Sequence, residues 1–272
     1  MGVNRGSLSP TCRFDRFDAI AEDYDAHFTH SLIGAAQRRV VWREMDREFG
    51  PGQRILEINC GTGVDALYLA AGGASVVACD ASAKMLEVAR RRLDMSPHGR
   101  HVDLRLLAIE QLSRLAGRYD GVLSNFSGLN CVADLRAVAC DLGRLVRPGG
   151  RVILCLFGRF CVWEICWYTF RGNLRKALRR LASVSVSANL TPNMQVSVSY
   201  HSIGSLRREF APHFRLLRWR GVGVATPPSY LEEWAARSTG LFPLAARVDP
   251  FLGRCPGLRA LGDHVLLVFE KV

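Results

Sequence analysis

Two glycines one residue apart, Gly61 and Gly63, stand between an apolar run at residues 54–58 and a helical run at residues 64–71. A short apolar run, a glycine turn and an amphipathic repeat predict a buried strand that leads into a helix. Glycines at this point let a nucleotide approach the backbone and the N-terminus of the helix. The feature constrains the fold strongly, because such a strand belongs in a parallel sheet whose carboxyl edge binds a ligand.

The alternation of strands and helices continues beyond this turn. Further strands are expected at residues 75–79, 102–107, 119–124 and 151–157, and later at residues 214–219 and 263–270. Helices are expected at residues 82–93, with Ser82 as N-cap, and at residues 134–146. Two amphipathic helices within residues 14–49 precede them and end at a Gly-Pro-Gly turn. This order predicts an α/β protein with a mostly parallel, doubly wound sheet.

After residue 157 the alternation breaks. An aromatic stretch leads into an expected basic helix within residues 160–181, which carries Arg171, Arg175, Lys176, Arg179 and Arg180. Alternating serine and valine at residues 183–199 predict one or two exposed strands. Helices are expected again at residues 205–210 and 227–246. The pattern indicates a cap inserted after the fifth strand.

The charge of the chain is unevenly distributed. Residues 1–150 carry 19 Lys and Arg against 18 Asp and Glu, whereas residues 151–272 carry 17 against 7. The basic half is expected either to face an anionic partner, such as an acidic substrate, a membrane surface or RNA, or to be a solvated face.

Cysteine spacing and hydropathy narrow the class of protein further. The nine cysteines form no C-x-x-C pair and no zinc spacing, so no metal site is expected. No apolar run reaches the roughly 20 residues of a membrane-spanning helix, and the N-terminus lacks the apolar stretch of a signal peptide. A cytoplasmic protein is expected.

Two carboxylates flank the glycine turn. Asp80 ends the second expected strand, where it can accept hydrogen bonds from both hydroxyls of a ribose. With Ala66 in the third position, the turn also satisfies the dinucleotide pattern, so the loop alone leaves a dehydrogenase and a methyltransferase open. Glu57 favours the second, because a carboxylate at the strand end repels a pyrophosphate and attracts the ammonium of a methionine.

The glycine turn belongs to a longer set of motif residues: Phe17-Asp18-x-x-Ala21-x-x-Tyr24-Asp25, Leu56-Glu57-x-Asn59-Cys60-Gly61-Thr62-Gly63, Asp80, Met85-Leu86-x-x-Ala89 and Pro148-Gly149-Gly150. Through this set, residues 14–157 resemble the class I S-adenosylmethionine-dependent methyltransferases, in their small-molecule branch. The resemblance implies a seven-stranded sheet with an antiparallel last strand. It also implies S-adenosylmethionine as cofactor, with S-adenosylhomocysteine as product.

The same resemblance implies a division of the chain. We expect a flexible tail at residues 1–13, a helical lid at 14–53 and a cofactor-binding core at 54–157. A substrate cap at 158–212 and a C-terminal completion of the sheet at 213–272, with a second cap segment, follow.

The resemblance also implies which residues bind the cofactor. Gly61 and Gly63 are expected against its methionine part, Asp80 at the ribose, Ala81 and Met85 near adenine, Asn125 at the reactive centre and Tyr24 as closure from the lid. At Ile109 and Glu110 the sequence departs from the aspartate frequent in the family, which leaves the polar contact to adenine open. The expected cofactor-binding residues are Tyr24, Glu57, Asn59, Cys60, Gly61, Gly63, Asp80, Ala81, Met85, Ile109, Glu110 and Asn125.

Catalysis by such a protein needs little sequence signature, because the methyl donor is already activated and the enzyme mainly aligns two reactants. His201 in the cap is the first candidate for a base, beside Asn125 and Tyr24. Ser124-Asn125-Phe126-Ser127 lacks the prolines of the [ND]-P-P-[YFW] motif, which disfavours methylation of exocyclic base nitrogens. A small, anionic or amphiphilic acceptor is expected. The alternatives are a membrane-associated protein that docks through residues 160–181, an RNA-modifying enzyme and a non-catalytic binding protein.

Overall fold

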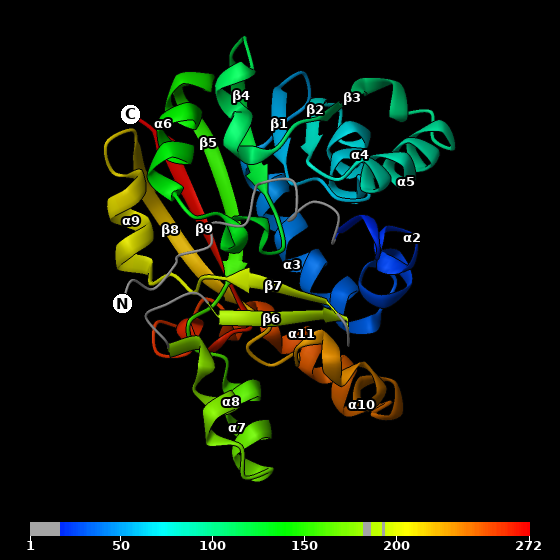
Figure 1. Ribbon diagram of the computed structural model, residues 1–272, viewed down its shortest axis with the longest axis vertical. Helices are drawn as coiled ribbons and strands as arrows, with labels where there is room; N and C mark the ends of the chain where they lie inside the picture. Colours follow the sequence, from blue (N-terminus) through cyan, green and yellow to red (C-terminus); the bar gives the residue numbers. More distant parts are fainter. Residues whose placement is uncertain (1–16, 182–185, 192–193) are drawn as a thin grey trace, which may run out of the picture.

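A seven-stranded sheet forms the centre of the molecule, with the strand order β3-β2-β1-β4-β5-β9-β8 (Figure 1). The computed structural model describes residues 17–181, 186–191 and 194–272. The strands are β1 (Arg54–Ile58), β2 (Ser75–Asp80), β3 (Val102–Leu106), β4 (Tyr119–Ser124), β5 (Val146–Phe157), β8 (Phe214–Val222) and β9 (His264–Lys271). Strands β1 to β5 pair in parallel, and β9 is antiparallel to both of its neighbours. The predicted sheet with an antiparallel last strand is confirmed.

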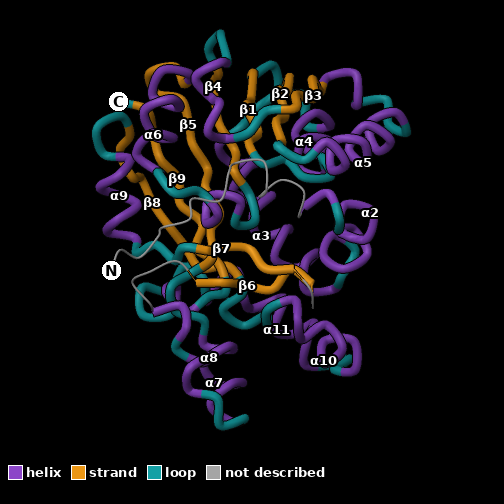
Figure 2. Tube along the Cα trace, viewed as in Figure 1, coloured by secondary structure: helices purple, strands orange, loops and turns teal. Residues whose placement is uncertain are grey.

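Helices cover both faces of this sheet (Figure 2). One face carries α6 (Leu135–Leu145) and α9 (Ile203–Phe210), and the other carries α3 (Leu32–Glu48), α4 (Val64–Ala71) and α5 (Ala83–Asp94). Successive side chains of a strand point to opposite faces, so Leu56 belongs to the first core and Ile55 to the second. Both are fully buried, which explains why β1 reads as a continuous apolar run.

Capping side chains fix where the main helices begin. The Ser82 hydroxyl accepts a hydrogen bond from the Met85 amide at 3.1 Å, as the sequence predicts. The Asp134 carboxylate accepts from two amides at the start of α6. Gly63 begins α4 in the left-handed region, with φ +74°, which a residue with a side chain adopts only under strain.

The carboxyl ends of β1, β2 and β4 meet at one edge of the sheet. Ile58 is in register with Cys79 of β2 on one side and with Ser124 of β4 on the other. From β1 the chain winds outward to β2 and β3 and then returns to the other side as β4, so the strand order reverses at β1. In sheets of this kind, ligands bind outside the carboxyl ends at the point of reversal.

The cap after β5 differs from the single basic helix that the sequence predicts. It consists of α7 (Val162–Phe170), α8 (Leu174–Ala177), η5 (Arg179–Leu181), β6 (Val186–Thr191) and β7 (Met194–Val198). Gly172 adopts φ +70° and ends α7, because a right-handed helix does not continue through that conformation. Arg171 therefore follows α7, Arg175 lies on α8 and Arg179 on η5, and the prediction of one continuous basic helix is wrong.

The helices expected in the N- and C-terminal segments are also divided into more elements than the sequence predicts. The lid comprises α2 (Ala21–Tyr24), a π-helical turn η1 (Asp25–Thr29) and α3, and the predicted tail at residues 1–13 lies outside the described residues. The helix expected at 227–246 is divided into η6 (Ser229–Leu231), α10 (Glu232–Arg237) and α11 (Leu241–Leu252). The remaining 3₁₀ turns are η2 (Gly99–His101), η3 (Ile109–Arg114), η4 (Gly128–Cys131) and η7 (Arg259–Leu261). Within the described ranges, every helix is too short or too polar to cross a bilayer.

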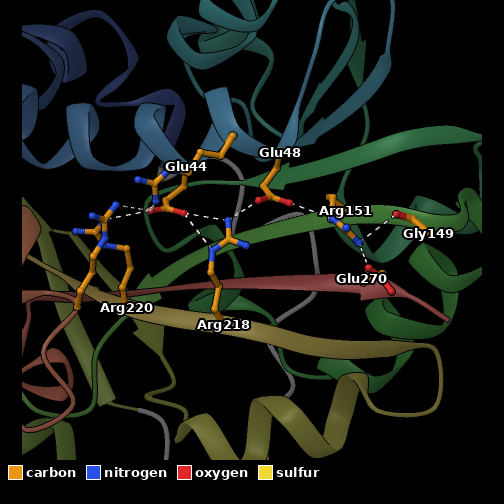
Figure 3. A network of polar contacts seen from close by, with 9 residues as sticks. Glu44, Glu48, Gly149, Arg151, Arg218, Arg220 and Glu270 are labelled. Atoms are coloured by element: carbon orange, nitrogen blue, oxygen red, sulfur yellow. Dashed lines mark hydrogen bonds and ion pairs between the residues drawn. The ribbon is translucent and has the colours of Figure 1, made fainter.

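A network of ion pairs fastens α3 to the far half of the sheet (Figure 3). Glu44 of α3 is 2% exposed and accepts hydrogen bonds from Arg220 at 3.0 Å and Arg218 at 3.1 Å, both from β8. Glu48, one turn later, pairs with Arg218 and with Arg151 of β5. The network places α3, and with it the lid, at a fixed position over strands that follow it by more than a hundred residues.

Glu44→Gln is expected to lower the free energy of unfolding by about 2 kcal/mol at neutral pH, because the buried Arg220 guanidinium loses its charged partner. Burial opposes ionisation of Glu44, yet the hydrogen bonds from Arg220 and Arg218 hold its pKa below the ordinary value. A lowered pKa means that this stabilisation is complete above the pKa of the unfolded chain and is lost as the pH falls through that of the folded protein. Urea unfolding of parent and variant between pH 7 and about pH 3 measures the difference, which should shrink in acid. Glu233→Gln, at an exposed position of α10, is the control; equal losses in both variants would contradict the role of the network.

Candidate active site

A cavity of about 960 Å³, including its open mouth, lies at the carboxyl edge of β1, β2 and β4. This size is in the range of small-molecule sites. Its walls come from the lid, the glycine turn, the ends of the three strands and the turn η4. The lining residues are Phe17, Tyr24, Arg38, Glu57, Asn59, Cys60, Gly61, Thr62, Val64, Asp65, Asp80, Ala81, Ser82, Met85, Ile109, Glu110, Asn125, Phe126, Gly128, Cys131 and Val132.

The Asp80 carboxylate fixes the backbone of the glycine turn through hydrogen bonds. One carboxylate oxygen of Asp80 accepts a hydrogen bond from the Gly61 amide at 2.8 Å, and the other accepts from the Ser82 amide at 2.9 Å. Burial raises the pKa of Asp80, although these backbone hydrogen bonds favour its ionised form. Gly61 itself has φ +53°, and a Cβ there would point into open space. The backbone is thus exposed to whatever fills the cavity, as the sequence suggests.

Glu57 presents a buried acidic side chain to the cavity. Its side chain is 1% exposed, and its Oε2 atom has no hydrogen-bond partner within the described residues. Burial, and then the nearby charge of Asp65, raise the pKa of Glu57 well above its ordinary range. A buried carboxyl group without a partner is costly, and a cation bound in the cavity would relieve that cost.

Beside Glu57 lies a buried ion pair that the sequence analysis did not single out. Arg38 of α3 donates to Asp65 of α4 at 2.6 Å, and Asp65 also accepts from Trp42 at 2.6 Å and from Asn125 at 2.8 Å. The Arg38 guanidinium lies 4.8 Å from the centre of the Phe126 ring, and its Nε atom has no partner in the part of the chain described. The network fixes a cation in the cavity wall and occupies the amide nitrogen of Asn125.

The lid closes over the glycine turn through its acidic residues. Asp18 accepts hydrogen bonds from the Ser82 hydroxyl at 2.5 Å and from the Lys84 amide at 3.2 Å. Asp25 of η1 accepts from the Thr62 hydroxyl at 2.8 Å and pairs with Arg92 of α5. Tyr24, between them, faces the cavity, and burial raises the pKa of its phenol to about 12. Tyr24 is therefore neutral at physiological pH and can donate a hydrogen bond.

The cap is attached next to this cavity. Asn130, within η4, donates to the Ser199 carbonyl at 2.7 Å, and its side-chain oxygen accepts from the Phe157 amide at 2.9 Å. The Ser199 amide donates in turn to the Asn130 carbonyl at 2.8 Å. These bonds join the end of β7 to the turn η4, two residues of which, Gly128 and Cys131, line the cavity.

Eleven of the twelve residues expected to bind a cofactor line this one cavity. Gly63 is the exception: a Cβ there would lie 3.0 Å from the Ala89 Cβ, so the residue faces α5 and serves the approach of two helices. Sequence reasoning missed Arg38 and Asp65. Their signal is a charged residue on the buried face of a predicted helix, which normally requires a buried partner.

The histidine proposed as a base is placed elsewhere. His201 precedes α9 and is not among the residues that line the cavity. Burial lowers its pKa, against the opposing charge of Glu209. A second histidine, His264, does not line the cavity either. It packs against the lining residue Phe126, with 5.5 Å between the two ring centres. Burial lowers the pKa of His264 as well, while Asp263 opposes the shift.

Comparison with known proteins agrees with these features. Residues 55–150 match a family described as "Methyltransferase domain". A demethylmenaquinone methyltransferase of Symbiobacterium thermophilum is 32% identical over 202 residues, which are 65% of this chain and 77% of that protein. One of Mycobacterium sp. (strain KMS) is 32% identical over 212 residues, or 76% of this chain and 86% of that protein.

Solved structures share the fold at low sequence identity. The CcbJ methyltransferase of Streptomyces caelestis aligns with a TM-score of 0.61 and 14% identity over 96% of this chain and 98% of that one. Magnesium protoporphyrin IX methyltransferase of Synechocystis, solved with bound S-adenosylhomocysteine, aligns with a TM-score of 0.58 and 16% identity over 96% and 99%.

A mostly parallel sheet with an antiparallel strand β9, an open glycine turn and a carboxylate at the switch point define an α/β protein of the kind that binds a nucleoside-containing cofactor. The chain belongs to the class I S-adenosylmethionine-dependent methyltransferases, and it acts on small molecules. The residues present fit the cofactor, because the unpartnered Glu57 carboxyl suits its ammonium group and the open Gly61 backbone leaves room beside it.

Proposed function

We propose that Glu57, Arg38 and Asp80 are the main polar contacts of S-adenosylmethionine. Glu57 would accept from the ammonium group, and the nearby Arg38 guanidinium, with its unpartnered Nε atom, would face the carboxylate. Asp80 would accept from the ribose hydroxyls while it keeps the Gly61 amide in place. Ala81, Met85 and Ile109 supply an apolar slot of the kind that adenine requires. The unpartnered Glu57 oxygen is the observation that carries this assignment.

The cofactor supplies a methyl group made electrophilic by a sulfonium charge, so the protein mainly aligns two reactants and excludes water. The lid performs the second task, because Asp18 and Asp25 tie it across the glycine turn. Neutral Tyr24 can orient a polar group of the acceptor. Asn125 lines the cavity, but its amide nitrogen is bound to Asp65, which makes Asn125 a positioning residue in this proposal.

We infer that the acceptor is an amphiphilic ring of the quinone type. The named relatives are demethylmenaquinone methyltransferases, and the alignments cover up to 76% of this chain. The cavity wall suits a flat ring, because the aromatic side chains of Phe17, Tyr24 and Phe126 line it. In its reduced, quinol form such a ring could take the methyl group at carbon, because a ring hydroxyl donates electron density. The proton displaced from that carbon would pass to water, so a histidine in the cavity wall is not required.

The acceptor is tested with a naphthoquinol that carries one short prenyl chain and one free ring carbon. Purified protein with radiolabelled S-adenosylmethionine is expected to transfer the label to that carbon, as mass spectrometry of the product would show. The same naphthoquinol with the ring carbon already methylated is the control. Labelling of an oxygen in both compounds would show that the enzyme methylates oxygen and not carbon. If the protein binds the cofactor in calorimetry but labels neither compound, the proposed quinone acceptor is refuted.

A further inference from the structure

The tip of the cap, residues 170–178, carries exposed apolar and basic side chains side by side. Phe170 at the end of α7 is 92% exposed, and Leu174 and Leu178, four residues apart on and after α8, are 60% and 50% exposed. Arg171, Arg175 and Lys176 alternate with them and are also exposed. Figure 1 shows α7 and α8 projecting from the molecule at the end remote from the sheet. Exposed apolar side chains that gather at one place on a surface often mark an interaction site.

The inner side of the same segment is firmly held. Trp163 and Trp167 of α7 pack with residues of α3, α10 and α11 in a separate apolar cluster. Glu164 of α7 is 1% exposed and is bound by Arg179 and Arg180. The tip is thus attached by packed rings and by a buried ion-pair cluster, and its exposed side chains lie on the side away from these contacts.

The cations of the tip stand over aromatic rings. The Arg171 guanidinium lies 4.1 Å from the centre of the Trp167 ring, and the Lys176 ammonium lies 5.5 Å from that of Tyr168. Between Glu164 and Glu209 the sequence has no acidic residue, and Glu164 is already paired. The tip therefore presents uncompensated positive charge together with apolar groups, which complements an anionic surface with an apolar layer beneath it.

We propose that the tip docks this methyltransferase on the surface of an anionic lipid bilayer. Phe170, Leu174 and Leu178 would enter the boundary between head groups and acyl chains, and the three cations would lie among the head groups. A nucleic acid would use the cations but gives no place to the two leucines, and so the lipid surface fits better. The docking goes beyond the proposed acceptor and does not depend on it, since binding to vesicles requires no methyl transfer.

Vesicle sedimentation of the purified full chain tests the docking. The parent protein is expected to bind phosphatidylcholine vesicles that contain a third of phosphatidylglycerol and to bind pure phosphatidylcholine far more weakly. The triple variant Arg171→Gln, Arg175→Gln, Lys176→Gln should bind the anionic vesicles about a hundredfold more weakly, as each cation near such a surface contributes about fivefold. Phe170→Ser should weaken binding by about tenfold through lost apolar burial.

Matched controls separate the tip from net charge. Arg114→Gln, Arg207→Gln, Arg208→Gln removes the same charge at exposed positions of η3 and α9, and Met95→Ser removes an apolar side chain that is 89% exposed. Both controls should bind like the parent, and calorimetric cofactor binding should be unchanged in every variant. The proposal is overturned if the parent does not bind anionic vesicles, if both triple variants lose binding equally, or if only an RNA homopolymer is bound through the tip.

Discussion

Arg180→Ala is expected to lower the free energy of unfolding by about 3–5 kcal/mol, the usual cost of removing one partner of a buried charge cluster. The Arg180 guanidinium donates to Glu164 at 2.8 Å and to the Asp263 carboxylate at 2.7 Å. All three side chains are 5% exposed or less. Without Arg180, Asp263 and part of the charge on Glu164 would stay buried without compensation, and the cap would lose its attachment to the start of β9.

Urea unfolding followed by circular dichroism measures this loss, with Arg175→Ala as the matched control. Arg175 is exposed on α8, and its removal should change stability by about half a kcal/mol or less. Arg180→Lys should not restore the parent value, because all three guanidinium nitrogens donate, to two carboxylates and to the Gly158 and Asp263 carbonyls, and an ammonium has too few donors to replace these bonds. Equal stability of the two alanine variants would show that the buried cluster contributes nothing.

Glu57→Gln is expected to weaken binding of S-adenosylmethionine roughly 10- to 100-fold, about 1.5–3 kcal/mol for hydrogen bonds to a charged group, and to stabilise the free protein. The second effect follows from the raised pKa of Glu57, which burial causes. A carboxyl group of this kind stabilises the folded state fully below its pKa in the unfolded chain, and the contribution is lost as the pH rises toward its pKa in the folded protein. At neutral pH the parent therefore carries a penalty that glutamine lacks.

Isothermal titration calorimetry and thermal unfolding of the same preparations check both effects. The melting temperature of the variant should exceed that of the parent by more at pH 8 than at pH 5, and cofactor affinity should fall at both. Glu87→Gln, on the exposed side of α5, should change neither quantity. Unchanged affinity together with higher stability would mean that Glu57 is buried for another reason and that the ammonium group lies elsewhere.

The sequence by itself determined the sheet and most of the residues that line the cavity at its carboxyl edge. Residues near in sequence settle a strand, a turn and a helix N-terminus, and parallel pairing then brings the carboxyl ends together. Glu57, Gly61 and Asp80 therefore meet in the structure as their positions predict. The N-cap at Ser82 depends on two residues only three positions apart, and it could therefore also be predicted from the sequence.

Only the tertiary structure decided which charged side chains are buried in ion pairs and which are exposed to solvent. Arg38 reaches the cavity because α3 packs against α4, and Arg180 is buried because β9 returns beside the cap; neither contact leaves a local pattern. The backbone conformation of Gly172 divides the expected basic helix. As a result, Arg171 and Arg175 are exposed to solvent, whereas Arg180 is buried. The physical reason is that the burial of a charge depends on partners distant in the chain, whereas strand and helix propensities act over a few residues.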